Sequence, residues 1–211
     1  EYSYSQKDEK ILKEIEIKNA PNKFFLATAT NWNYDKTRPA YIFLTNGIGT
    51  CTNLEELKSM AFDRYEANPI GLKEFAKEFL KKTDFNIEDY SISKVDIPQE
   101  LLIGIPEFIA KTLPEKPKAY QVLFKHKNSD NFLLLDEESL GTQIVFAFIP
   151  FLADTLKNVK VLVIDELDKS LHTFLVQYIV EMFNNPEANK YGSQLIFNTH
   201  DTNLLDLNIL R

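Results

Sequence analysis

Two adjacent acids, Asp165 and Glu166, stand directly after an apolar run in the stretch VLVIDELDKSLH, from Val161 to His172. A third acid, Asp168, follows two residues later. An unpaired charge at the edge of a hydrophobic core is costly, so acids in this place require a partner or a ligand. Carboxylates can hold a magnesium ion or take a proton from an attacking water molecule. These acids are therefore the first candidates for chemistry in the chain.

A second polar cluster follows the next apolar run, in LIFNTHD from 195 to 201. If both runs are strands of one parallel sheet, their carboxyl ends meet at the edge where such sheets bind ligands. Phosphoryl transfer to water needs a carboxylate for magnesium, a base for the water and a group that contacts the γ-phosphate. Asp165, Glu166 and His200 have these residue types. Asp201 is also expected to cap a helix that starts after it.

A third candidate site lies upstream, in LLLDEESLGTQ from 133 to 143. Ser139 and Gly141 are predicted to stand at the N-terminus of a helix, where free amides and the helix dipole favour a phosphate group. Gly141 has no side chain, so a backbone amide can approach a ligand closely there. This segment precedes the acidic run by the length of one helix.

The elements that must position these residues follow the pattern of an α/β protein. In chain order, the pattern predicts strands at 120–127 and 131–138, a helix at 142–157, a strand at 159–165, a helix at 171–185 and a strand at 193–200. Continuous apolar strands that alternate with helices are typical of a parallel sheet. Pro150 predicts a kink or a new start within the helix at 142–157.

The first half of the chain is mostly helical by the same criteria. Residues 10–18 alternate apolar and charged residues, which suits a half-buried strand or a short helix. Residues 22–32 predict a helix whose first turn Asn22 caps. Within 54–82, apolar residues recur at three- and four-residue spacing, most clearly at Leu72, Phe75, Ala76, Phe79 and Leu80. We therefore expect two lobes that divide near residue 100, at 1–100 and 101–211.

Composition excludes several classes of protein. The 211 residues carry a formal net charge of −7, which argues against a chain-wide basic surface for nucleic acid or anionic membrane. The single cysteine, Cys51, excludes an internal disulfide and a multi-cysteine zinc site, and it fits a reducing cytoplasm. No apolar run reaches the roughly 18 residues of a membrane span, and no signal peptide opens the sequence. A cytoplasmic protein without a membrane partner is expected.

The run from ESLGTQ through VLVIDELDKSLH to LIFNTHD resembles the second half of an ABC-class ATPase head. It is most similar to the SMC-like, AAA-type ATP-binding proteins that bacteria often carry in phage-defence loci. The resemblance covers 120–211, and KFFLATATNWNYDKTRPAYIF upstream resembles the helical insertion of that family. It implies the C-terminal part of a P-loop ABC-type ATPase head, an α/β fold with a parallel sheet. The lobe at 1–100 would then be the helical insertion, and the lobe at 101–211 would carry the ATPase motifs.

The resemblance also implies roles for the residues at the acidic run. Asp165 matches the Walker B aspartate that holds magnesium, and Glu166 matches the general base. His200 matches the switch histidine that contacts the γ-phosphate. Asp168 lies in the segment that matches the D-loop, which crosses the interface between two protomers.

Ser139 and Gly141 match the signature motif, which binds the γ-phosphate of a nucleotide held by the opposite protomer. The expected cofactors are ATP and Mg²⁺, and the expected partner is a second copy of the chain in a head-to-head dimer. Family members of this kind also suggest work on DNA or in phage defence, with DNA and a nuclease as further partners. The motif here reads S-L-G-T, so it departs from S-G-G-Q at Leu140 and Thr142.

A larger departure concerns the phosphate loop, since G-x-x-x-x-G-K-[ST] occurs nowhere in the 211 residues. Without it, this chain alone is expected to bind ATP poorly and to be inactive. In the family, that loop lies near the N-terminus. The sequence begins at Glu1 rather than methionine, and we expect it to be a piece of a longer ATPase.

Other readings of these motifs stay open. The acids after the strands and the Ser139–Gly141 pair could be plain helix caps. The chain could be a non-catalytic interaction module that retains the ATPase fold, for which the missing phosphate loop is the main argument. The cluster of Asp165, Glu166, Asp168 and His200 could instead belong to a metal-dependent hydrolase or nuclease.

Overall fold

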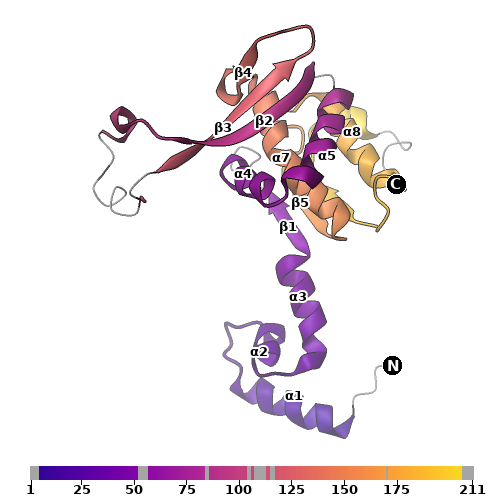
Figure 1. Ribbon diagram of the computed structural model, residues 1–211. Helices are drawn as coiled ribbons and strands as arrows, with labels where there is room; N and C mark the ends of the chain where they lie inside the picture. The colour runs from indigo at the N-terminus through magenta and orange to yellow at the C-terminus, as the bar shows by residue number, and fades with distance from the viewer. Residues whose placement is uncertain are drawn as a thin grey trace.

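The computed structural model describes residues 5–51, 57–83, 86–103, 106, 113–114, 117–169 and 171–205. These residues form an α/β body and a separate group of helices from the N-terminal part of the chain (Figure 1). The strand β1 (Ile48–Cys51) leads from the helical group into the body.

The body contains a parallel sheet of three strands in the order β1-β5-β6. β5 (Val161–Ile164) lies in the middle and β6 (Gln194–Phe197) beside it. Ile164 pairs with Cys51 on one side and Phe197 on the other, so all three carboxyl ends lie at one edge. The predicted α/β class and the predicted neighbourhood of β5 and β6 are confirmed. β1 was not predicted, because IGTC is short and contains a glycine.

The helix α7 (Leu140–Lys157) forms the centre of the hydrophobic core. Pro150 lies inside it, yet the helix is continuous, so the predicted new start at this proline is wrong, and the alternative of a kink stays a prediction. A proline removes the hydrogen bond to the carbonyl four residues earlier, here that of Phe146. The Tyr65 hydroxyl donates to that carbonyl at 2.9 Å, so Tyr65 replaces the missing backbone donor.

Among the described helices, α7 alone is long and apolar enough to meet the length and composition of a membrane span. However, 61% of that 18-residue window is buried inside the body. Its apolar surface is therefore used in packing, as expected for a core helix.

Three further helices pack around this centre. α4 (Leu57–Ala67) and α5 (Pro69–Lys82) lie against α7, and α8 (Thr173–Asn184) connects β5 to β6. The apolar face predicted for α5 is confirmed: Leu72, Ala76, Phe79 and Leu80 are buried, and Phe75 packs against the core.

A second sheet is antiparallel, in the order β2-β3-β4. β2 (Ile87–Asp96) pairs with β3 (Lys118–His126), which pairs in turn with β4 (Phe132–Leu134). The strands predicted at 120–127 and 131–138 correspond to β3 and to β4, of which β4 is the shorter. A 3₁₀ turn, η4 (Leu135–Glu137), then leads into α7. A second such turn, η3 (Gln99–Leu102), follows β2.

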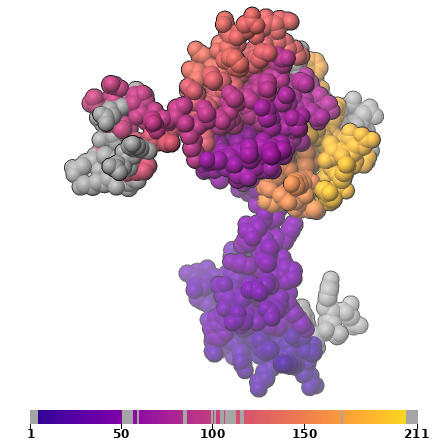
Figure 2. All heavy atoms as spheres, viewed as in Figure 1, coloured from indigo at the N-terminus to yellow at the C-terminus, as the bar shows by residue number. Residues whose placement is uncertain are grey.

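The packing does not follow a division near residue 100. β1 and β2 precede that residue, and both pair with strands that follow it. The separate unit is instead the helical group of α1 (Gln6–Lys18), α2 (Phe25–Asn31), η1 (Asp35–Thr37) and α3 (Arg38–Asn46). Figure 2 shows this group as a lobe beside the body. Strands such as β2, in which buried and exposed residues are mixed, bury only some of their side chains. Their part in the core is therefore difficult to predict from the sequence.

Inside the helical group, two local predictions can be compared with the structure. Residues 10–18 belong to the helix α1, which was one of the two forms expected. α2 starts at Phe25 and has no side-chain cap, so the predicted capping by Asn22 is wrong. A small core of Ile15, Ala29 and Tyr34 holds the group together.

Candidate functional site

The site is built where β5 and β6 end side by side. Asp165 directly follows β5, and Asn198 directly follows β6. The Asn198 side-chain amide donates from Nδ2 to Asp165 Oδ1 at 2.5 Å. Its Oδ1 accepts from the Glu166 backbone amide, also at 2.5 Å. One side chain therefore fixes both adjacent acids at the carboxyl edge of the sheet.

Glu166 adopts a left-handed backbone conformation with φ of 52°. This region is uncommon for a residue with a side chain, and it persists only where the surroundings impose it. Here the next residue is held firmly, because Leu167 is fully buried and its amide donates to the Asn198 carbonyl at 3.1 Å. A tight turn follows, in which the Lys169 amide donates to the Glu166 carbonyl. The chain thus turns sharply at Glu166.

The Glu166 carboxylate faces two cationic or ionisable groups. His200 Nε2 lies 3.8 Å from Oε1, and Lys169 Nζ lies 3.1 Å from Oε2. The exposed fractions are 42% for the Glu166 side chain and 84% for His200. Such exposed ion pairs contribute little to the stability of the fold. Their placement instead determines which charged groups this edge of the sheet presents to solvent. A carboxylate and a histidine are thus available together to a ligand.

Asp168 connects the loops that follow the two strands. Its Oδ1 accepts from the His200 backbone amide at 3.1 Å. Partial burial acts to raise the pKa of Asp168, but hydrogen bonds from the Thr199 hydroxyl and the His200 amide outweigh it. The pKa therefore lies below the ordinary 3.8, and Asp168 is ionised at neutral pH.

Ser139 and Gly141 lie at the start of α7, as predicted. Ser139 is the N-cap, and its Oγ accepts from the Thr142 amide at 3.1 Å. The amides of Leu140 and Gly141 have no partner within the helix, as is general for the first turn. In the described part of the chain, no hydrogen bond or ion pair joins Ser139 or Gly141 to the carboxyl edge. The structure thus shows two separate groups of candidate residues.

Asn198 and Thr199 were not identified from the sequence. Asn198 stands directly after the run LIF, just as Asp165 stands directly after VLVI. In a parallel pair these two places are neighbours, so an amide beside an acid is the signal that could have found Asn198. Asp201 was predicted as a helix cap, and its Oδ1 accepts from the Asn203 amide at the start of η5 (Thr202–Leu205).

The side chains at this edge fit a magnesium ion that has few protein ligands. No group of three or more His, Cys, Asp or Glu side chains suited to a metal ion occurs among the residues that the structure describes. Mg²⁺ is commonly held by one or two carboxylates together with phosphate oxygens and water, and the exposed Asp165 suits that arrangement. A cavity of about 580 Å³ lies elsewhere, between α5, the end of α7 and the segment before β6. The candidate residues do not line it.

A sequence model of the family described as "AAA domain, putative AbiEii toxin, Type IV TA system" matches residues 52–206. The α/β fold with a parallel sheet agrees with the class that this match indicates, the P-loop ATPases. The chain belongs to this family of AAA domains. The AAA ATPases generally bind ATP with Mg²⁺.

Among proteins of curated function, none matches the chain. It is similar to a solved structure described as "Structural biochemistry of ATP-driven dimerization and DNA stimulated activation of SMC ATPases". The two are 15% identical with a TM-score of 0.39, and the match covers 70% of this chain and 76% of the other.

Proposed function

We propose that the chain is part of an ATPase head that hydrolyses ATP at the carboxyl edge of its parallel sheet. The supporting observation is that Asn198 fixes Asp165 and Glu166 beside each other, with His200 Nε2 3.8 Å from Glu166. These residue types can hold magnesium, take a proton from the attacking water and contact the γ-phosphate, which phosphoryl transfer to water requires at one place. Plain helix caps would not require a side chain just after β6 to hold two acids of the loop after β5.

Each residue then has its own task. Asp165 holds Mg²⁺, which neutralises charge on the phosphoryl oxygens when it is bound. Glu166 takes the proton of the attacking water, since its carboxylate is exposed at the edge. His200 donates from its ring to the γ-phosphate. Asp168 accepts a hydrogen bond from the His200 backbone amide and so fixes the backbone position of this histidine.

Ser139 and Gly141 would serve a nucleotide that a second copy of the chain holds. A short turn after α7 reverses the chain into β5, so the N-terminus of α7 and the carboxyl edge of β5 point toward the same end of the body (Figure 1). A two-fold dimer could therefore bring the start of α7 in one chain onto the carboxyl edge of the other. The amides of Leu140 and Gly141 suit a phosphate.

The proposal requires a phosphate loop, and residues 1–211 do not contain its motif. This favours a second candidate, a non-catalytic interaction module with the same fold. The coding sequence upstream of Glu1 separates the two. A glycine-rich loop that ends in Lys-Ser or Lys-Thr after a strand supports the ATPase, and the lack of any such loop supports the module. DNA-linked or phage-defence work with a nuclease remains a proposal for the output.

The experiment for this site is Asp165→Asn in the complete protein. The amide can keep a bond with Asn198 but loses the charge that holds Mg²⁺. We expect Mg²⁺-dependent ATP hydrolysis to fall by at least about a hundredfold. Asp130→Asn, in the exposed turn of the β3–β4 hairpin, is the matched control and is expected to leave the rate unchanged. Wild-type turnover in Asp165→Asn would rule out this edge as the magnesium site.

A further inference from the structure

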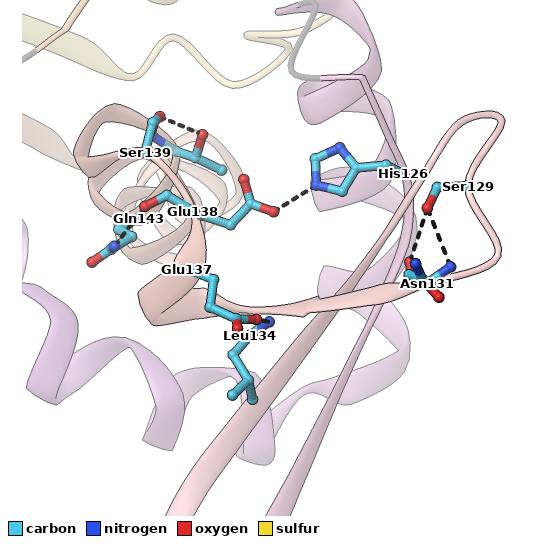
Figure 3. Close-up of polar contacts among 9 residues, drawn as sticks. His126, Ser129, Asn131, Leu134, Glu137, Glu138, Ser139 and Gln143 are labelled. Atoms are coloured by element: carbon cyan, nitrogen blue, oxygen red, sulfur yellow. Dashed lines mark hydrogen bonds and ion pairs between the residues drawn. The ribbon is translucent and has the colours of Figure 1, made fainter.

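A histidine of the antiparallel sheet contacts the residue just before the cap of α7. His126 is the last residue of β3, and Glu138 lies between η4 and Ser139. His126 Nε2 and Glu138 Oε1 are 2.5 Å apart. The exposed fractions are 20% for the His126 side chain and 7% for that of Glu138. Figure 3 shows the imidazole ring directed at the carboxylate, with Ser139 next along the chain.

The backbone of Glu138 is held from a second side. Gln143 Nε2 donates to the Glu138 carbonyl at 2.8 Å, and Lys58 Nζ donates to Gln143 Oε1 at 2.8 Å. The segment before the cap is therefore tied to β3 through its side chain and to α4 through its carbonyl. Just upstream, the Leu134 amide donates to Glu137 Oε2 at 2.7 Å, which closes the turn that leads into the helix.

These contacts bear on the phosphate-binding end of α7. Ser139 follows Glu138 directly, and the amides of Leu140 and Gly141 follow Ser139. A rotation of the Glu138 backbone would redirect all three groups. Misplacement of a binding group by about 1 Å can lower a rate by roughly a hundredfold. The half-buried His126 contact is thus placed to control a geometry that the proposed function needs.

We propose that His126 is a positioning residue, which acts through Glu138 to hold the start of α7 in the orientation that binds the partner protomer's γ-phosphate. This inference rests on the proposed function, because it assigns a support for Ser139 and Gly141 in that same site. His126 itself does not touch the nucleotide. Its hydrogen bond is of the stronger, charge-assisted kind because the acceptor is a carboxylate, and it is shielded from water.

The test compares His126→Ala with His126→Gln in the complete protein. Alanine removes the donor to Glu138, whereas the glutamine amide can still donate. We expect kcat for ATP to fall about tenfold in His126→Ala, which corresponds to the loss of one such bond. The affinity of the separated protomer for ATP should not change, since Ser139 acts on the partner's nucleotide. His126→Gln should recover most of the turnover.

Ser129→Ala is the matched control. Ser129 lies in the turn of the same hairpin, and its hydroxyl bonds with the Asn131 backbone. It should leave kcat unchanged. Thermal unfolding of every variant shows whether the fold is retained. Wild-type kcat in His126→Ala, or an equal loss in folded His126→Ala and His126→Gln, would overturn the inference.

Amide hydrogen exchange at 139–143 separates this inference from the proposed function. If the wild-type protein does not hydrolyse ATP, the proposed function fails, and the exchange rates then decide on His126. Faster exchange at 139–143 in His126→Ala, restored in His126→Gln, supports the positioning of this turn. Exchange that is unchanged in His126→Ala overturns it, whatever the ATPase rate.

Discussion

The Asn198 side chain gives the two acids their geometry. It uses both ends of its amide, one as donor to Asp165 and one as acceptor from the Glu166 backbone. Neither an acid nor a hydrophobic residue could do both. The positive φ of Glu166 is maintained by the same contact, so this one residue supports the position and the backbone conformation of the proposed base.

Asn198→Ala tests this role at the scale of a single residue. It leaves the Glu166 amide without its acceptor and Asp165 Oδ1 without its donor. We expect kcat for ATP to fall about tenfold or more, because the acids lose their fixed positions. The control is Gln194→Ala, at the opposite and exposed end of the same strand. Steady-state ATPase assays measure both, and equal rates in Asn198→Ala and wild type would argue against the role.

The acids are easier to identify from the sequence than the residues that support them. Asp165 and Glu166 stand out because charge directly after an apolar run is costly. Asn198 is neutral and follows an apolar run without conflict, so only the register between β5 and β6 assigns it a task. His126 carries no such signal in the sequence, and it is half-buried against Glu138 because two segments far from the acidic run meet there.

At the scale of elements, the helix α7 shows how a proline is accommodated in a core. The hydroxyl of Tyr65 donates to the carbonyl that Pro150 leaves without a partner, and the Tyr65 ring stacks on Phe146 at 4.7 Å. Burial raises the pKa of Tyr65 well above its usual value, so the hydroxyl keeps its proton. The helical periodicity of the sequence reveals the proline within α7. It does not reveal the compensating tyrosine, because Tyr65 lies on another helix.

Tyr65→Phe isolates that hydroxyl, because phenylalanine keeps the ring stacking. The Phe146 carbonyl would then lose this replacement donor inside the core. We expect the free energy of unfolding to fall by about 1–3 kcal/mol. Denaturant unfolding measures this, with Tyr120→Phe as the control for an exposed hydroxyl. A loss no larger in Tyr65→Phe than in Tyr120→Phe would contradict the explanation.

The strands differ in how well their sequences predict them. β5 and β6 are apolar runs between helices, and the order of elements alone suggests a parallel sheet. β2 reads IEDYSISKVD, in which apolar residues are scattered among charges, because one of its faces is exposed to solvent. β1 has four residues and becomes recognisable as a strand only by its pairing with β5.

The helical group depends on one buried acid. Asp8 bonds with Lys36, Ser5 and Tyr34, and these contacts lower its pKa to about 2, with Lys36 as the largest cause. A lowered pKa in the folded state stabilises the fold above the unfolded pKa of 3.8. That contribution is lost as the pH falls from about 4 to about 2.

Trp32, the single tryptophan, lies in this group and reports on it. We expect Trp32 fluorescence to show loosening of α1–α3 as the pH falls from about 4 to about 2. In Asp8→Asn the helical group should be less stable at pH 6, and the Trp32 fluorescence should change less between pH 4 and 2. The same acid transition in Asp8→Asn and wild type would remove Asp8 as the cause.

At the scale of the whole molecule, the candidate residues occupy two separate places, the start of α7 and the carboxyl edge of β5 and β6. Neither place is a closed pocket, since Asp165, Ser139 and His200 are all exposed. If the site is shared between two chains, both places are expected to be open in one chain alone. Water is then excluded only when the second chain covers them. The helical lobe joins the body at the amino end of β1, which is the end opposite the carboxyl edge (Figure 1).

The most direct measurement of the central claim is ATP hydrolysis by Glu166→Gln in the complete protein. Glutamine retains the shape of the side chain and cannot take the proton of the attacking water. We predict a fall in kcat of about 10²–10⁴, with ATP still bound and the dimer accumulating in its presence. Hydrolysis by Glu166→Gln at the wild-type rate would contradict the account.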